Sequence, residues 1–204
     1  QVNTHAIGDR GNRLVLDSYE AVLKAMPTAD HRFRVEHAQI LHSDDIPRFA
    51  ELGVIAAMQP VHCTSDMDWV PARLGEVRAT GAYAWRSLLA SGARLCFGTD
   101  FPVEAADPLP GLYAARTRTH PDGTPAGGWL PGERLSGREA LALYTAGSAY
   151  AQFRERELGR VAPGFLADLT VLSGDPAACP PEELLGLRAL LTIVGGAVRY
   201  EAPR

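Results

Sequence analysis

Three side chains that could share a metal ion stand near the ends of expected β-strands. His5, His37 and Asp100 each lie at or just past the carboxyl end of a short apolar or alternating segment. In α/β proteins the carboxyl ends of parallel strands meet at one edge of the sheet, where ligands bind. Two imidazoles and one carboxylate are good ligands for a divalent metal such as zinc. We therefore expect His5, His37 and Asp100 to form a metal site.

Each of these residues also has a structural explanation when it is taken alone. Asp100 could be a metal ligand, a general base, or the N-cap of the following helix. A single histidine at a strand end often serves only as a hydrogen-bonded structural residue. The recurrence of the pattern at three strand ends favours a shared site over three separate structural roles.

A fourth histidine lies near the same edge, in a segment that we expect to be a long irregular loop over residues 61–76. Loops of this length in small domains are often lids or binding loops. His62 could therefore contact a substrate, and the alternative is an exposed loop histidine. Asp66 and Asp68 in the same segment are interpreted as solvated acids, with a role at the mouth of the site as the alternative.

The segments that position these residues alternate between strands and helices, with a repeat near 30 residues. The expected strands are residues 1–7, 33–37, 54–58 and 94–98, and the expected helices are residues 11–26, 43–52, 83–91, 108–119 and 136–157. This alternation predicts parallel strands with right-handed helical crossovers. Beyond residue 159 the pattern changes to β-rich segments at 167–172, 190–194 and 197–200, and the pair Gly195-Gly196 predicts a hairpin.

Composition excludes several classes of protein. The 204 residues are 46% hydrophobic and 22% charged, with a formal net charge of −4, which is typical of a soluble globular domain. The sequence contains no basic stripe for nucleic acid and no apolar run of about 20 residues for a membrane span. Cys63, Cys96 and Cys179 are odd in number and widely spaced, which indicates reduced thiols and a cytoplasmic location.

Four motifs, taken in order, resemble those of the amidohydrolase superfamily, in its branch of metal-dependent hydrolases similar to YtcJ. The motifs are Thr4-His5-Ala6-Ile7-Gly8-Asp9, Arg34-Val35-Glu36-His37-Ala38-Gln39, Met58-Gln59-Pro60 and Gly98-Thr99-Asp100-Phe101-Pro102. The segments 159–164, 167–172 and 195–200 also resemble that family's return from its barrel to a small β-sandwich. The resemblance covers nearly the whole chain.

The resemblance implies an α/β fold that is the carboxyl-terminal half of a (β/α)8 TIM-like barrel. Residues 1–158 would hold strands five to eight, and residues 159–204 would be a portion of the small β-sandwich domain. His5 would match the metal-binding histidine of strand five, His37 that of strand six, and Asp100 the acid of strand eight. The family pattern also includes an HxH motif on the first strand, which this sequence does not contain.

The function implied is hydrolysis of a carbon–nitrogen bond in a non-peptide amide by a metal-activated water. A bound zinc ion lowers the pKa of its water to about 7. Asp100 would be the catalytic residue that takes the proton of this water and gives it to the leaving nitrogen. The partner would be a small-molecule amide-like substrate, contacted by His62 and by the loops 61–76 and 120–131.

Two other functions remain open at this point: a non-catalytic half-barrel, and a small-molecule binding or oligomerising module. The chain begins at Gln1, without an initiator Met, inside an expected strand. We therefore expect a carboxyl-terminal piece of a longer enzyme. The open edges of its sheet would be covered by a missing amino-terminal half or by a second copy in a homo-oligomer.

Overall fold

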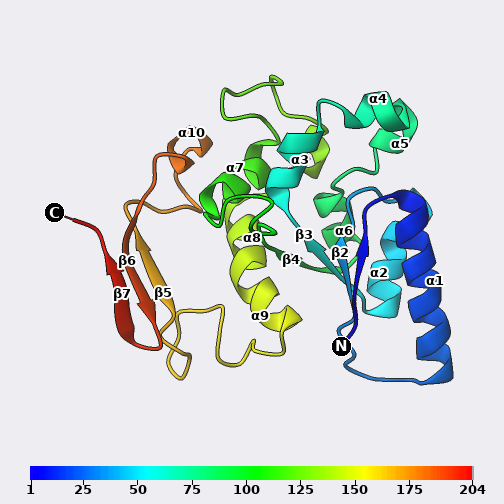
Figure 1. Ribbon diagram of the computed structural model, residues 1–204, viewed down its shortest axis with the longest axis horizontal. Helices are drawn as coiled ribbons and strands as arrows, with labels where there is room; N and C mark the ends of the chain where they lie inside the picture. Colours follow the sequence, from blue (N-terminus) through cyan, green and yellow to red (C-terminus); the bar gives the residue numbers. More distant parts are fainter. Residues whose placement is uncertain (204) are drawn as a thin grey trace.

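The computed structural model describes residues 1–203 and contains two sheets (Figure 1). The first sheet comprises β1 (Asn3–Ala6), β2 (Arg34–His37), β3 (Ile55–Met58) and β4 (Arg94–Phe97). The second comprises β5 (Leu169–Leu172), β6 (Ala189–Val194) and β7 (Ala197–Glu201). The helices are α1 (Asp9–Ala25), α2 (Ile46–Leu52), α3 (Pro60–Asp66), α4 (Val70–Leu74), α5 (Glu76–Ala79), α6 (Trp85–Ala90), α7 (Leu109–Thr117), α8 (Gly137–Ala142), α9 (Ser148–Ala151) and α10 (Pro181–Leu184).

The first four strands form one parallel sheet in chain order, β1-β2-β3-β4. At least one helix lies between each strand and the next, so the predicted α/β alternation is confirmed. Because all four strands run in one direction, their carboxyl ends lie at the same edge of the sheet. The residues that follow each strand are therefore brought together there.

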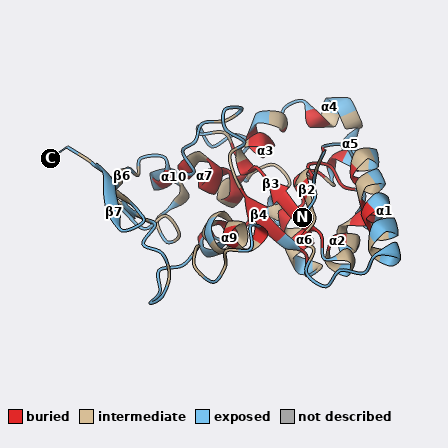
Figure 2. Ribbon diagram, turned by 60° about the horizontal axis from the view of Figure 1, so that its bottom comes forward, coloured by how far each residue is buried: buried red, intermediate tan, exposed pale blue. Residues whose placement is uncertain are grey.

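The main core lies between this sheet and its helices. Val35, Ala56 and Leu95 are aligned across three neighbouring strands and are at most 3% exposed. They belong to one apolar cluster with residues of α1, α2 and α6, namely Leu16, Phe49 and Leu88. Burial of each of these large side chains contributes about 1.5–3 kcal/mol to stability. Figure 2 shows the burial concentrated in the parallel sheet and on the faces of the helices that cover it.

The opposite face of the sheet is only partly covered. Ile55, Ala57 and Cys96 form a second, smaller apolar cluster with Ala151 of α9. On β2 the same face carries Arg34 and Glu36, which are half-buried and form an ion pair. A parallel sheet normally has both faces covered, so this polar face differs from the rest of the sheet.

The segment over residues 61–76 is not the irregular loop that the sequence predicts. It folds into the short helices α3 and α4, and α5 begins at Glu76. Pro60 and Pro71 stand in the first turns of α3 and α4, where proline is favoured because it lacks an N–H. Cys63, Met67 and Val70 are buried, so the segment packs as a helical layer.

The predicted helix over residues 136–157 is shorter and less regular than expected. Ser136 caps α8 through a capping box with Glu139, as the sequence predicts. A π-helical turn at Leu143–Gly147 then interrupts the α-helix, and α9 ends at Ala151. Phe153 has a left-handed backbone, with φ of 62°, which prevents the helix from continuing.

The remaining strands form an antiparallel sheet in the order β5-β6-β7. Gly195 and Gly196 make the tight turn between β6 and β7, with φ of 58° and 78°, so the predicted hairpin is confirmed. Both positions need the left-handed conformation that glycine adopts without strain. No helix within residues 1–203 is both long and apolar enough to cross a lipid bilayer.

Candidate metal centre

The strand ends of the parallel sheet bring four ligand-type side chains to one place. His5 lies in β1, His37 ends β2, His62 lies in α3 directly after β3, and Asp100 follows β4. Ligand atoms of His37, His62 and Asp100 all lie within 4.8 Å of one another, close enough for one cation to be shared. The ring of His5 packs edge-on against His37, with 4.6 Å between the ring centroids. The structure therefore places all four predicted residues at one edge.

His37 reaches this edge because the backbone departs from regular strand geometry. Its partner across the sheet is Ala6, which is 4% exposed and packs in the core on the helix side. Regular alternation would turn His37 toward the same core. Instead, His37 and Ala38 have left-handed backbones, with φ of 79° and 46°, and the His37 ring lies against His5. Such strain at non-glycine residues is concentrated at functional sites.

Gln59 fixes the orientation and the tautomer of His37. Its Oε1 lies 2.9 Å from His37 Nδ1 and accepts a hydrogen bond from that nitrogen. The lone pair of the neutral ring is then on Nε2, which is free to bind a metal. Burial lowers the pKa of His37 below 6.5 and outweighs the opposing effect of the Gln59 hydrogen bond, while the nearby His5 lowers it further. His37 is therefore neutral at pH 7, as a metal ligand must be.

His62 has a buried nitrogen that requires a partner. The side chain is 9% exposed, and its Nε2 has no hydrogen-bond partner among residues 1–203. The ring is stacked on His37, with centroids 5.8 Å apart and planes inclined by 20°. An unsatisfied buried polar atom costs about 1–3 kcal/mol, so it calls for an explanation. A cation shared with His37 and Asp100 would satisfy this nitrogen, so the residues present fit a divalent metal.

Asp100 stands on the exposed side of the cluster. Its backbone is left-handed, with φ of 58°, and the residue is exposed. Its backbone carbonyl accepts a hydrogen bond from the amide of Val103, which closes a turn. The predicted alternative of an N-cap is not what the structure shows, because α7 begins only at Leu109 and Asp107 accepts the hydrogen bond from the Leu109 amide.

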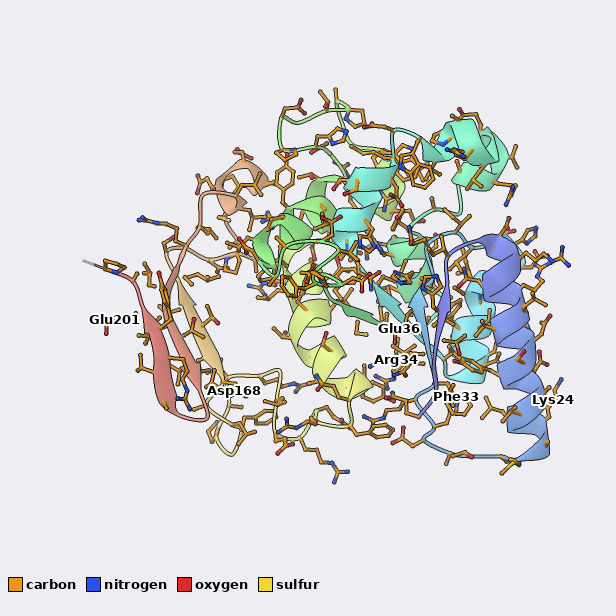
Figure 3. All side chains as sticks on the ribbon, in the orientation of Figure 1. Lys24, Phe33, Arg34, Glu36, Asp168 and Glu201 are labelled. Atoms are coloured by element: carbon orange, nitrogen blue, oxygen red, sulfur yellow. The ribbon has the colours of Figure 1, made fainter. Side chains whose placement is uncertain are left out.

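A pocket of about 320 Å³ lies beside this edge, on the polar face of the sheet. Its lining includes Arg34 and Glu36 of β2 together with Gln59 and Gly98, which are close in sequence to His62 and Asp100. Figure 3 shows Arg34 and Glu36 next to each other on the side of β2 opposite helix α1. The pocket would give a small molecule access to the strand ends from this face.

Cysteine chemistry does not compete with the metal site. Burial raises the pKa of the Cys63 and Cys96 thiols to about 12, so neither is a thiolate near neutral pH. Cys63 neighbours His62 in α3, but its side chain is fully buried in the core. A thiolate nucleophile is therefore not available from these two residues.

The expectation that Asp66 is a solvated loop acid is wrong. Its Oδ2 accepts hydrogen bonds from the Tyr83 hydroxyl at 2.5 Å and from Gln39 Nε2 at 2.8 Å. Asp68 is exposed, as predicted, and lies 3.1 Å from His120 Nε2. Because the segment was interpreted as an irregular loop, the one-turn separation of His62 and Asp66 in α3 was not recognised.

Two further residues that support the strand ends were missed at the level of sequence. Gln59 was noticed only as part of a motif, with no role assigned. The buried Asn12 of α1 donates from Nδ2 to the carbonyls of Ile7, Gly8 and Ile40. It thereby ties the turn after β1 to the segment after β2. Only the hydrogen-bond geometry identifies both roles, since each residue is a common polar type.

Comparisons with known proteins show which family this chain resembles. The sequence model of the amidohydrolase family matches residues 1–200. The chain is 38% identical over 203 residues to the YtcJ protein of Bacillus subtilis (strain 168), covering 98% of this chain and 37% of that protein. It is 33% identical over 198 residues to an N-substituted formamide deformylase from Arthrobacter pascens, covering 97% of this chain and 36% of the deformylase.

Solved structures show the same relationship. A metal-dependent hydrolase from Pyrococcus horikoshii OT3 aligns with a TM-score of 0.76 and 32% identity, over 89% of this chain and 35% of that one. The atrazine chlorohydrolase TrzN from Arthrobacter aurescens TC1, solved with zinc, aligns with a TM-score of 0.66 and 26% identity, over 98% of this chain and 44% of TrzN.

The family model matches nearly the whole sequence, and the parallel sheet carries ligand-type residues at its strand ends. Together these two findings define a hydrolase-type α/β protein. The chain belongs to the amidohydrolase family. It spans about a third of the length of the curated relatives it matches. The predicted resemblance to YtcJ-like metal-dependent hydrolases is thereby confirmed.

Proposed function

We propose that these residues form part of the active site of a metal-dependent hydrolase that cleaves carbon–nitrogen bonds in non-peptide amides. The observation that carries this proposal is the convergence of His37, His62 and Asp100 around the buried, unpartnered Nε2 of His62. A cluster of imidazole and carboxylate groups at strand ends is suited to a divalent cation, with zinc as the expected ion. The zinc in the similar TrzN structure supports this choice.

The proposed ligands are His5, His37 and Asp100, as the sequence predicts, with His62 as a candidate for a further position. His37 would use Nε2, because its Nδ1 is occupied by Gln59. His62 could bind through its unpartnered Nε2 or contact the substrate, as the sequence predicts. When bound, the metal supplies a Lewis acid that makes a nucleophile from water near neutral pH.

Asp100 is the proposed catalytic acid and base. A carboxylate at the exposed side of the cluster can take a proton from the attacking water. The same group can then give this proton to the departing nitrogen, which must be protonated to leave as a neutral amine. His37 cannot serve this purpose while its Nδ1 is held by Gln59 and its Nε2 binds a metal.

The substrate class rests on chemistry shared with a relative. Removal of a formyl group from an N-substituted formamide breaks the bond between a carbonyl carbon and nitrogen, and one relative is named for this reaction. The pocket beside Gln59 and Gly98 has room for a small molecule. We therefore propose a small amide-like compound as substrate, with the helices of residues 61–76 and the segment 120–131 at the rim.

The same proposal assigns the architecture. The four parallel strands would be strands five to eight of a (β/α)8 barrel, and residues 159–204 a portion of a β-sandwich. β1 and β4 are the outermost strands of the sheet, and each would then pair with a strand from the amino-terminal half, which relatives nearly three times as long would contain.

Metal content of the purified protein tests this function. We expect near-stoichiometric zinc by elemental analysis in the parent and a large loss in His37→Ala. His31→Ala is a matched control, because His31 is a half-buried histidine whose side chain, within the part of the chain that the structure describes, hydrogen-bonds only to the backbone of Leu52 and Phe33. Absence of zinc, cobalt and manganese from the parent after incubation with each ion would refute the proposal.

His62→Ala separates the two roles that are open for this residue. If His62 is a ligand, the variant binds zinc more weakly than the parent. If it contacts the substrate, the variant keeps its zinc and the KM for a formamide substrate increases.

A further inference from the structure

A hydrogen-bonded cluster of Gln39, Asp66 and Tyr83 lies between the segments that hold His37 and His62. We propose that Gln39, Asp66 and Tyr83 are positioning residues that fix His37 and His62 relative to each other for a shared metal ion. This inference rests on the proposed function, because it assumes that the two histidines serve one metal site. None of the three residues is itself among the ligand-type cluster.

The three side chains are joined by direct hydrogen bonds. Asp66 Oδ2 accepts from the Tyr83 hydroxyl at 2.5 Å and from Gln39 Nε2 at 2.8 Å. Gln39 Nε2 also contacts the Tyr83 hydroxyl oxygen, which closes a three-membered ring of contacts. Hydrogen bonds to a carboxylate are about twice as strong as those between neutral groups. The cluster is therefore a firm link between three segments that are distant in sequence.

Two members of the cluster, Gln39 and Asp66, each lie close along the chain to a histidine of the site. Gln39 lies two residues beyond His37, just past the left-handed pair that turns the His37 ring. Asp66 lies four residues beyond His62 in α3, so both side chains are on the same face of that helix. A bond from Gln39 to Asp66 therefore limits the movement of β2's end relative to α3.

Tyr83 is held rigidly, so it can act as a fixed point for the other two. Its side chain is fully buried and its backbone is left-handed, with φ of 51°. Its amide donates to the carbonyl of Gln39 at 2.6 Å, and its own carbonyl accepts from Arg118 Nη1 at 2.9 Å. Burial raises the pKa of the Tyr83 hydroxyl, which keeps its proton and remains a donor to Asp66.

Arg118 supports the backbone at Tyr83. The guanidinium is buried, bonds to the carbonyls of Ala82, Tyr83 and Trp129, and stacks over Trp85 at 4.6 Å. It forms no ion pair with an acidic residue within residues 1–203. Burial of a charged group costs solvation, and the hydrogen bonds to these carbonyls and the contact with the aromatic ring offset that cost and hold the backbone around Tyr83 in place.

The geometry of ligand atoms determines how tightly they bind a metal, and the residues behind them determine that geometry. Loss of a hydrogen bond made directly to a ligand histidine typically lowers metal affinity by about 10–100-fold, and residues one contact further from the metal should act at the lower end of that range, about 10-fold. We expect Tyr83→Phe, which removes only the hydroxyl, and Asp66→Ala to raise the zinc Kd by this factor. Asp66→Asn keeps one acceptor oxygen and should have a smaller effect than Asp66→Ala.

The test is a competitive zinc titration of the purified protein, together with the visible spectrum of the Co²⁺-substituted form. A changed cobalt spectrum reports altered ligand geometry, which a loss of stability alone would not produce. Tyr113→Phe is the matched control, because it removes a buried tyrosine hydroxyl that bonds to Thr119 and the carbonyl of His120. This variant should keep the parental Kd and spectrum.

The outcomes separate this inference from the function on which it rests. If the parent binds zinc and Tyr83→Phe and Asp66→Ala match it in both Kd and cobalt spectrum, the positioning role is overturned and the metal site stands. If the parent binds neither ion, both proposals fail together. Should Asp66→Ala fail to fold, Tyr83→Phe retains the ring and its packing, so it decides the question alone.

Discussion

The contact between Gln59 and His37 gives the sharpest prediction about the site. Gln59 is 7% exposed, and its Oε1 accepts from His37 Nδ1 at 2.9 Å, while its Nε2 lies 3.4 Å from the carbonyl of Ala57. Gln59→Leu has a similar shape but no acceptor. It leaves the half-buried Nδ1–H of His37 without a partner and frees the ring to rotate or to change tautomer.

Two magnitudes follow from this geometry. An unsatisfied buried donor costs about 1–3 kcal/mol, so at this half-buried position the metal-free variant should be destabilised by about 1 kcal/mol. Loss of the group that orients a ligand histidine should weaken zinc binding by about 10–100-fold. At about 1.4 kcal/mol per tenfold change in Kd, this corresponds to roughly 1.4–2.8 kcal/mol of binding free energy.

The assays are urea denaturation of the metal-free protein and zinc titration against a competing chelator. Gln59→Glu is the matched control, because its carboxylate still accepts from His37 Nδ1 and should bind zinc at least as tightly as the parent. If Gln59→Leu keeps both the parental free energy of unfolding and the parental Kd, Gln59 does not orient His37 and the assignment of Nε2 as the ligand atom is refuted.

Three further predictions concern the core, an ion pair and pH. Phe49→Ala removes a fully buried ring and should lower the free energy of unfolding by about 3–5 kcal/mol in urea, whereas Val77→Ala, at an 86% exposed position, should change it by less than about 0.5 kcal/mol. The Arg78 hydrogen bond lowers the pKa of Asp9 below 3.8, so the stability from this pair is present above pH 3.8 and is lost as pH falls through the folded-state pKa. The difference in unfolding free energy between the unmodified protein and Asp9→Asn should therefore shrink to zero in acid. A difference that stays constant with pH would contradict this prediction. Because burial holds the pKa of His37 below 6.5, the contribution of His37 to zinc affinity should decline only below pH 6.5. A decline in zinc affinity that begins above pH 7 would contradict this prediction.

Local sequence patterns predicted most of the parallel sheet because buried strands and their helices have short-range signatures. Apolar runs such as the one around Leu95, ended by Gly98, identify a covered strand without reference to the rest of the chain. The Gly195-Gly196 turn and the capping box at Ser136 are equally local, since the residue types match the backbone geometry they require. These elements are all present as predicted.

The segment over residues 61–76 was mistaken for a loop because its helices are too short to show a clear period. The step of four positions from His62 to Asp66 makes barely one turn, and a single turn has no repeating apolar face. Its burial against α7 and the helices around it, rather than its intrinsic propensity, makes it helical. For the same reason Asp66 could not be recognised as a half-buried hydrogen-bond acceptor.

The sequence by itself determined the candidates for the site, because His5, His37 and Asp100 stand near the carboxyl ends of strands whose parallel order forces those ends to one edge. Only the tertiary structure decided how they meet. The left-handed backbone at His37, the acceptor Gln59, the unpartnered Nε2 of His62 and the Tyr83–Asp66 contact each depend on residues distant in the chain. Spacing along a sequence records which strand a side chain follows, but the direction of a ring and its hydrogen-bond partner are determined by packing across the fold.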